Sequence, residues 1–221
     1  MLERLKALNN RPVYSISDGQ FRNYGKVVTK YDFSELISYM ERQTEIPEDG
    51  NVYYPSVKEM EALKIYEELK NNLYGRMDIQ IGYCNGRNSS INGLEYHRGC
   101  EVNIAVTDQA FFLGHIWDMI NNTYYQKNAE IFYVKKGQAI IFYETTLHFS
   151  PCKVREEGFK TVVVLLRGTN LPLEEKTSYK EEEDKILFMK NKWLIVHENC
   201  LPLISRGAYA GLKGENVFLK Y

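Results

Sequence analysis

The feature of this sequence that most constrains its fold is a change in the spacing of apolar residues at Met77. Before Met77, apolar residues recur every three or four positions. From Met77 onward, Ile79 and Ile81 continue an alternation with the polar residues Asp78 and Gln80. A helix repeats every 3.6 residues and a strand every two, so helices are expected before this point and strands after it. The chain is therefore predicted to be mainly β with N-terminal helices.

Two amphipathic helices are predicted after a short one at residues 1–10. Residues 32–43 carry apolar side chains at helical spacing, and Asp32 or Ser34 is the expected N-cap. A second helix begins at Ser56, with Glu59 as its capping-box partner, and ends before Gly75. Their apolar stripes are expected to pack against the core.

Short strands separated by turn residues fill the middle of the chain. They are predicted at residues 77–84, 94–99, 101–107, 109–115, 129–135, 138–144, 147–154 and 159–166. Many closely spaced strands with Gly and Asn turns are typical of a sandwich or a barrel, and an up-and-down arrangement fits the count equally well.

These elements divide the chain into four parts. Residues 1–76 are expected to form a helical and extended segment that packs on a barrel, and residues 77–170 form the barrel. Residues 171–185 are a charged linker. Residues 186–221 hold strands carrying Trp193 and Phe218, which complete the barrel or form the interface of a homodimer.

Composition excludes several classes of partner. A formal net charge of -1 and no long run of Lys or Arg argue against a nucleic-acid partner. The apolar runs are strand-sized, so no membrane span is predicted, and the first residues do not resemble a signal peptide. Cys84, Cys100, Cys152 and Cys200 are scattered, which predicts reduced, buried thiols in a cytoplasmic protein.

Four residues are candidates for a metal site. If one strand continues through Gly99, then Glu95, His97 and Glu101 point to the same side of it. Alternation in a second strand places His148 on one face with Ser150 and Cys152. Two carboxylates with imidazole suit Zn, Mn, Ni or Fe(II) and do not select one of them. The alternative is structural: surface carboxylates, a half-exposed His97 and a core His148 bonded to backbone.

The spacing of these residues resembles the two motifs of the cupin family. The first motif is His, one residue, His, three or four residues, Glu, and the sequence has Glu95, His97 and Glu101 at that spacing, with Glu in place of the first His. The second runs from Gly through Pro-x-Gly to His and Asn. Gly137, His148 and Cys152 keep its spacing, while Tyr143, Thr145 and Cys152 replace its Pro, Gly and Asn. The resemblance implies a jelly-roll β-barrel, with the fourth ligand least well matched.

Longer segments resemble ureidoglycolate lyase, a cupin-fold enzyme that forms glyoxylate and urea. The segments are FRNYGKVV at 21–28, LEYHRG at 94–99 and GQAIIFYETTLHFSP at 137–151. The whole chain is similar to an uncharacterised bacterial cupin family, and EYHRGCEVNIAV at 95–106 is similar to sugar and uronate isomerases with cupin barrels. The helices at 33–73 and the chain beyond about 170 lie outside the lyase resemblance.

The expected function is that of a metal-dependent lyase or isomerase acting on a small hydroxy-acid, ureido-acid or sugar-derived substrate. Glu101 is the preferred base, and Glu95 is the alternative. Tyr143 is the candidate donor to an oxyanion, and Lys153 and Arg167 are the candidate partners of a substrate carboxylate. The alternatives are a non-catalytic binding or sensing cupin and a structural dimer-forming barrel. His115 and His197 are interpreted as structural.

Overall fold

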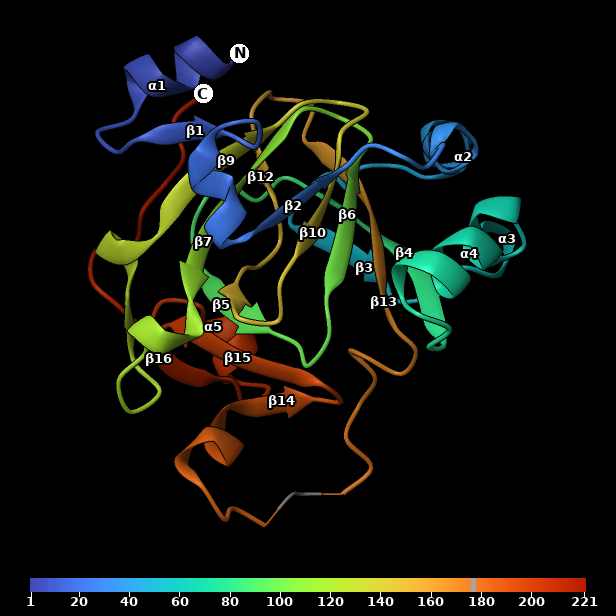
Figure 1. Ribbon diagram of the computed structural model, residues 1–221. Helices are drawn as coiled ribbons and strands as arrows, with labels where there is room; N and C mark the ends of the chain where they lie inside the picture. Colours follow the sequence, from blue (N-terminus) through green and yellow to red (C-terminus); the bar gives the residue numbers. More distant parts are fainter. Residues whose placement is uncertain (176–177) are drawn as a thin grey trace.

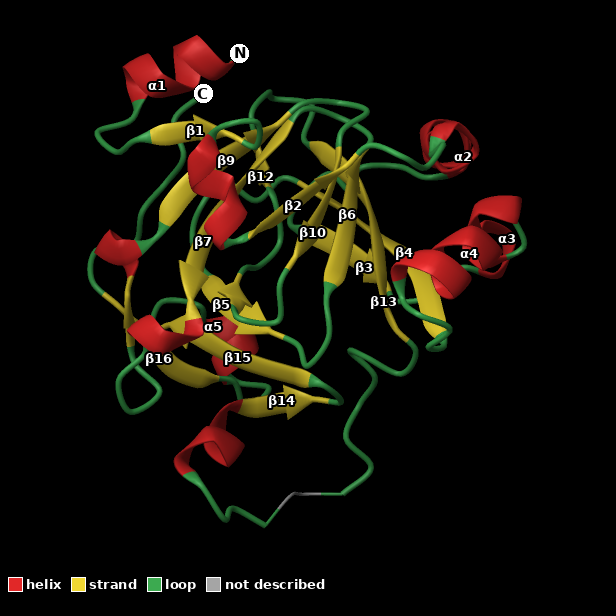
Figure 2. Ribbon diagram, in the orientation of Figure 1, coloured by secondary structure: helices red, strands yellow, loops and turns green. Residues whose placement is uncertain are grey.

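The computed structural model describes residues 1–175 and 178–221, and three β-sheets form its body (Figure 1). Figure 2 shows that strands make up most of this body and that the helices of residues 34–43 and 58–68 lie together at one side of it. The sequence-based expectation of a mainly β chain with N-terminal helices is confirmed. Among the described residues, no helix has the length and apolar character needed to span a membrane.

The largest sheet has six strands in the order β2-β10-β6-β13-β4-β3. Their bounds are β2 Gly25–Val28, β3 Asn51–Tyr54, β4 Ile79–Gly86, β6 Glu101–Ala105, β10 Ala139–Phe142 and β13 Phe159–Leu166. All five pairings are antiparallel. In β6, Val102 and Ile104 point to one face of the sheet, while Glu101 and Asn103 point to the other, so the strand places two polar side chains together.

A second sheet packs against the inner face of the first. Its strands are β1 Val13–Ser15, β7 Gln109–His115, β9 Glu130–Val134, β11 Thr146–Leu147 and β12 Cys152–Lys153. Phe111 and Phe132 of this sheet and Ile140 and Phe142 of the first belong to one buried apolar cluster. The rings of Phe111 and Phe142 meet edge to face, with their centroids 5.0 Å apart. Two β-sheets thus share one apolar core.

Helices cover the outer face of the six-stranded sheet. They are α2 Ser34–Gln43, α3 Lys58–Glu61, α4 Lys64–Glu68 and the π-helical turn η2 Leu69–Leu73. Leu36 and Met60 pack in one cluster with Val102 and Val162 of the sheet. The second predicted helix is divided after Glu61.

The predicted caps of these helices are partly wrong. The Ser56 hydroxyl donates to Glu61 at 2.7 Å, so the predicted capping box with Glu59 does not form. Asp32 accepts a hydrogen bond from the Ser34 N–H at 2.9 Å, as expected of a capping side chain, although Phe33 is the residue that precedes α2.

A third sheet closes one end of this body. It contains β5 Gly93–Tyr96, β8 Tyr124–Tyr125, β14 Leu187–Met189, β15 Lys192–His197 and β16 Tyr209–Lys213. β5 pairs with β15 in antiparallel register, with Tyr96 opposite Trp193. The remaining helices are α1 Leu2–Leu8, α5 Leu201–Ile204 and the 3-10 turns η1 Gly19–Asn23, η3 Ile116–Asp118, η4 Gln126–Asn128 and η5 Glu182–Ile186.

The parts into which the chain was divided contribute to the body in different ways. Residues 1–76 do more than pack on a barrel, because they supply β1, β2 and β3 to the sheets. Residues 186–221 pair with β5 of the same chain, and a role in a homodimer remains a prediction. Phe218 is 59% exposed.

The predicted linker at 171–185 ends in the helical turn η5, where Glu183 accepts a hydrogen bond from Arg98 at 2.7 Å. This interaction ties the end of the segment to the body of the protein. Residues 176 and 177 of the predicted linker lie outside the described residues.

Candidate metal centre and adjoining pocket

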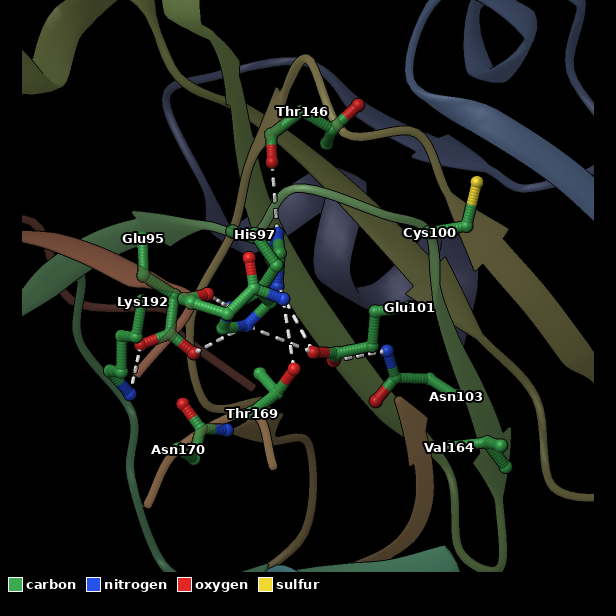
Figure 3. A network of polar contacts seen from close by, with 12 residues as sticks. Glu95, His97, Cys100, Glu101, Asn103, Thr146, Val164, Thr169, Asn170 and Lys192 are labelled. Atoms are coloured by element: carbon green, nitrogen blue, oxygen red, sulfur yellow. Dashed lines mark hydrogen bonds and ion pairs between the residues drawn. The ribbon is translucent and has the colours of Figure 1, made fainter. Parts of the chain in front are cut away.

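Two glutamates and two histidines converge where the third sheet meets the other two (Figure 3). We call them the acid–histidine cluster; its members are Glu95, His97, Glu101 and His148. Glu95 lies in β5, and Glu101 is the first residue of β6. All four side chains are buried, and His97 is 1% exposed.

The predicted reason for this convergence is wrong. The chain does not continue as one strand through Gly99, because β5 ends at Tyr96 and Gly99 has a φ of 122°. That φ lies in the left-handed region that glycine adopts at low cost. A Cβ at this position would also lie 2.7 Å from Leu166 Cδ1. The turn carries the chain from the third sheet into the first, and Glu101 then faces His97 from a different sheet.

The second predicted strand is also interrupted. His148 follows β11 and forms an isolated antiparallel bridge with Glu95. Ser150 lies outside the cluster and accepts a hydrogen bond from Asn51 at 2.8 Å. Cys152 lies in β12, where its sulfur accepts a hydrogen bond from Asn88 at 3.4 Å. His148 is thus the residue of this segment that joins the cluster.

The side-chain nitrogens and oxygens of the cluster lie close together. His97 Nε2 is 3.6 Å from Glu95 Oε1 and 3.4 Å from Glu101 Oε2. His148 Nε2 is 3.3 Å from the same Glu101 oxygen. One ligand atom from each of Glu95, His97 and His148 lies within 4.8 Å of the others. Two atoms bound to one cation at about 2.1 Å in tetrahedral geometry are separated by about 3.4 Å, so these spacings fit a shared ion.

Backbone carbonyls fix the orientation of both imidazole rings. His97 Nδ1 donates to the Asn191 carbonyl oxygen at 2.7 Å, and His148 Nδ1 donates to the Thr146 carbonyl oxygen at 2.9 Å. Since a carbonyl only accepts, each Nδ1 carries the proton, an assignment made from the hydrogen-bond network. Nε2 is therefore the nitrogen that faces the cluster, and on His97 a metal ion would displace the proton that the neighbouring carboxylates stabilise there. Metal-binding histidines are held in this way by their outer neighbours.

The two carboxylates have different neighbours. Glu101 Oε1 accepts a hydrogen bond from Asn103 Nδ2 at 2.8 Å. Glu95 Oε2 forms an ion pair with Lys192, whose side chain is nearly buried, and Figure 3 shows the two pointing toward each other. Lys192 is the first residue of β15, so the third sheet supplies a positive charge to the centre.

The pKa values of these groups reflect burial opposed by charge. Burial raises the pKa of Glu95, but Lys192 and His97 lower it more, to about 2. Burial likewise raises the pKa of Glu101, and the histidines together bring that pKa below its usual range. Burial lowers the pKa of His97, but Glu101 and Glu95 raise it more, to about 9. Both carboxylates are therefore ionised at neutral pH.

The residues present fit a divalent metal ion. His97 Nε2 is buried and has no hydrogen-bond partner among residues 1–175 and 178–221. A buried polar atom without a partner is costly and calls for an explanation such as a bound ion. Carboxylate oxygens and imidazole nitrogens together form a ligand set that suits transition metals.

A pocket of about 480 Å³ adjoins the cluster, and Glu95 and Glu101 belong to its lining. Its polar lining residues are Asn51, Tyr53, Asn103, Ser150, Asn170, Lys192 and Arg206, and its apolar ones include Phe149, Val163, Phe188, Leu194 and Leu203. The Tyr53 hydroxyl accepts a hydrogen bond from Asn170 at 2.9 Å. The volume and the mixed lining suit a small polar molecule.

Three residues expected at the site lie elsewhere. Tyr143 does not line the pocket and is 37% exposed. Lys153 pairs with Glu156 at 3.0 Å, and Arg167 pairs with Glu61 at 2.9 Å. Each was expected at the site because of its nearness in sequence to His148 or to a strand end. None of the three belongs to the lining of this pocket.

Lys192, Asn191 and Asn103 are the main residues that sequence reasoning missed. The two-residue repeat of β6 places Asn103 beside Glu101, so the pattern contained a signal for it. Lys192 and Asn191 are about 100 residues from the first motif and carry no local signal.

His115 and His197, interpreted as structural, lie outside the cluster. His115 stacks between Tyr24 and Trp117, and His197 Nε2 donates to the Gly214 carbonyl oxygen at 2.9 Å.

Comparison with known proteins gives one match over most of the chain. The family model described as "Domain of unknown function (DUF4867)" matches residues 13–217. No curated protein sequence matches this one.

Solved structures that are similar in part include mutants of oxalate decarboxylase from Bacillus subtilis. A single-substitution serine mutant is 12% identical, covers 57% of this chain and 28% of its own, and has a TM-score of 0.35. A tryptophan-to-phenylalanine mutant is 13% identical, with coverages of 59% and 29% and a TM-score of 0.34. A two-residue deletion mutant is 10% identical, with coverages of 44% and 24% and a TM-score of 0.31. The matched part thus spans less than a third of the oxalate decarboxylase chains.

Proposed function

We propose that this chain, which belongs to the DUF4867 family, is a metal-dependent enzyme whose acid–histidine cluster holds one divalent cation. The observation that carries the proposal is the state of the two imidazole rings. Both rings use Nδ1 on backbone carbonyls, and the remaining His97 Nε2 is buried beside two carboxylates without a hydrogen-bond partner among the described residues. A metal ion would coordinate this atom in place of a proton, together with the carboxylates beside it.

Glu95, His97 and His148 are the proposed ligands, because their ligand atoms lie close to one another. Glu101 is a fourth ligand or the base. Zn, Mn, Ni and Fe(II) all accept this combination of oxygen and nitrogen donors. A bound divalent ion supplies Lewis acidity, which polarises a substrate carbonyl or lowers the pKa of a substrate hydroxyl.

The substrate is proposed to be a small hydroxy-acid, ureido-acid or sugar derivative. In the pocket, Lys192 and Arg206 replace Lys153 and Arg167 as the cations that attract a carboxylate. Burial raises the pKa of Tyr53, and the nearby Glu101 and Glu95 raise it further, so its hydroxyl keeps its proton and can donate to the substrate. Asn103 and Asn170 offer amide groups for substrate hydroxyls.

The reaction is proposed to be a lyase or isomerase step that begins with proton transfer. Glu101 belongs to the pocket lining, and its Oε2 is the atom proposed to accept a proton from the substrate. Asn103 holds the other oxygen of this carboxylate. Cleavage of a ureido-acid and isomerisation of a sugar derivative both require a proton to move next to a polarised oxygen.

The architecture is proposed to be a cupin-like jelly-roll barrel. The face-to-face packing of two sheets around Phe111 and Phe142 supports this, since a jelly roll consists of two packed sheets and all their pairings except that of β1 with β9 are antiparallel. The cluster lies at one end of this sandwich, where the third sheet closes it, as expected for a ligand site in the mouth of a barrel.

The test is elemental analysis of the purified protein after exhaustive dialysis. The variants are His97→Ala and His148→Ala, with His115→Ala as the matched control, because His115 stacks on Tyr24 outside the cluster. We expect close to one equivalent of a transition metal in the wild type and the control, and loss of it in both cluster variants. Circular dichroism shows whether each variant is folded. Metal absent from a folded wild-type protein, even after incubation with each candidate ion, would contradict the proposal.

A further inference from the structure

A second depression, of about 640 Å³, concentrates positive charge outside the acid–histidine cluster. Four basic side chains from separate segments of the chain line it: Arg76, Arg98, Arg167 and Lys190. Asp78 is the acidic residue in the same lining, and it pairs with Lys70 at 2.6 Å. The chain as a whole has a formal net charge of -1, so its composition alone does not predict four basic side chains around one depression.

Two of the guanidinium groups are held in place from outside the depression. Arg98 donates to Glu183 at 2.7 Å, and its guanidinium carbon lies 4.6 Å from the centre of the Trp193 ring. Arg167 donates to Glu61 at 2.9 Å and to the Tyr66 hydroxyl at 3.2 Å. In both cases one terminal nitrogen makes these bonds, and a guanidinium has five N–H donors. Each group is therefore oriented and keeps donors for a ligand.

Arg76 is different, because its guanidinium makes no ion pair or hydrogen bond within the described part of the chain. Its backbone holds a positive φ of 71°, and its N–H donates to the Lys70 carbonyl oxygen at 2.8 Å. A non-glycine residue with this φ is uncommon. The turn thus fixes an unpaired arginine at the edge of the depression.

We infer that this depression is a binding site for a small phosphate dianion, either free phosphate or the phosphate group of a small phosphomonoester. Arginine presents N–H donors in a planar fork that matches two phosphate oxygens, and a cluster of arginines is the usual protein ligand for this group. Lys190 adds a point charge, although it also pairs with the exposed Glu174. Exposed ion pairs of this kind are weak, so the lysine is available to the anion.

The anion site is separate from the metal pocket and does not depend on the proposed enzyme activity. Thr169 and Asn191 line the anion site, whereas the adjacent residues Asn170 and Lys192 line the metal pocket. Backbone hydrogen bonds join these two segments: the Asn170 N–H donates to Lys190 O and the Lys190 N–H donates to Leu171 O, both at 2.9 Å. These hydrogen-bonded segments contribute residues to both linings, so they separate the anion site from the metal pocket.

Titration calorimetry of the full chain with inorganic phosphate, in a phosphate-free buffer at low salt, tests the inference. Arg76→Gln and the double variant Arg76→Gln/Arg98→Gln remove charge, and the exposed Arg22→Gln is the matched control. Arg76 has no intramolecular ion pair to lose, so its single variant keeps the fold. We expect saturable binding in the wild type and control, and about tenfold or greater weakening in the double variant.

Two further arms identify the ligand and the site. Glycerol 2-phosphate should displace phosphate, and acetate at the same concentration should not. Binding should persist with EDTA present, because phosphate held by a metal ion would be released. Absence of saturable heat, equal affinity in the double variant, loss of binding with EDTA or equal displacement by acetate would each overturn the inference.

Discussion

Glu95 and His148 are joined by two reciprocal backbone hydrogen bonds, from the Glu95 N–H to the His148 carbonyl oxygen at 2.6 Å and from the His148 N–H to the Glu95 carbonyl oxygen at 3.0 Å. This pairing holds their Cα atoms opposite each other across an antiparallel bridge. Because the backbone sets the spacing of two proposed ligands, the site is organised before a metal ion arrives. Replacing a neighbour of the cluster should therefore alter metal affinity without rearranging the site.

The first prediction concerns Asn191, whose carbonyl oxygen accepts the His97 Nδ1 hydrogen. Its side chain also accepts from the Arg98 N–H at 2.9 Å and donates to Thr169 at 2.8 Å, and its φ is 55°. Asn191→Val removes these bonds and the one from the side chain to the Arg98 carbonyl oxygen, and it disfavours this φ, so metal affinity should fall by about 10 to 100-fold. Asn191→Gly allows the same φ, so this variant should lose less metal affinity than Asn191→Val. Competition with a chromogenic chelator measures both, and equal affinities in all three proteins would contradict the prediction.

The second prediction concerns the buried ion pair between Lys192 and Glu95. Lys192→Met leaves Glu95 as a buried carboxylate without its cation, so the metal-free protein should lose about 2 to 4 kcal/mol of unfolding free energy. Lys213→Met is the matched control, because Lys213 makes an exposed pair with Glu198 at 3.7 Å and should cost less than about 0.5 kcal/mol. Urea denaturation in the presence of EDTA gives both values. Similar losses in the two variants would show that the buried pair is not stabilising.

The third prediction concerns the thiols, which the sequence suggested were all buried. Cys100 is exposed and Cys200 is half-buried, whereas burial raises the pKa of Cys84 to about 12. Cys152 is also buried, and burial raises its pKa well above the usual range. Since the thiolate is the reactive form, a disulfide reagent at pH 8 should modify Cys100 first and Cys200 next. Cys84 and Cys152 should react only after denaturation. Peptide mapping by mass spectrometry identifies the modified residues, and early labelling of Cys84 would refute this order.

Local pattern was sufficient for some strands and insufficient for others. β7 and β13 begin and end at the predicted residues; in β13, Thr161–Leu166 is a continuous apolar and β-branched run. β1, β2, β3 and β8 have four residues or fewer, too few for a repeat to be distinguished. They are strands because neighbouring strands offer them hydrogen-bond partners, which is a property of the folded chain and not of the segment.

The candidate site was found by motif spacing and not by the strand geometry assumed for it. His97 and Glu101 meet across a turn at Gly99, and the expected single strand does not exist. Asn191 and Lys192 could not be predicted because the pairing of β15 with β5, nearly 100 residues away in sequence, brings them there. Tyr143 is the opposite case. Its place in the second motif suggested that it donates to an oxyanion, but its side chain is 37% exposed and does not line the pocket.

The fourth prediction concerns Glu61, which connects the helical layer to the six-stranded sheet. Its Oε1 accepts from the Ser56 hydroxyl at 2.7 Å and the Ile81 N–H at 3.1 Å, and its Oε2 accepts from Arg167 at 2.9 Å. Burial raises the pKa of Glu61, but these hydrogen bonds lower it more, so the folded-state pKa is below the ordinary value. The carboxylate therefore stabilises the fold above the ordinary glutamate pKa of about 4.3, and this contribution is lost as the pH falls through the lowered value.

Glu61→Gln should then cost about 1 to 3 kcal/mol of unfolding free energy at pH 7 and progressively less toward pH 3. Glu59→Gln is the matched control, because Glu59 lies in the same helix α3 and is exposed. Urea denaturation at several pH values gives the difference between each variant and the wild type. A cost in Glu61→Gln that does not shrink as the pH falls would show that the amide disrupts packing, and that the ionised carboxylate is not what ties α3 to the sheet.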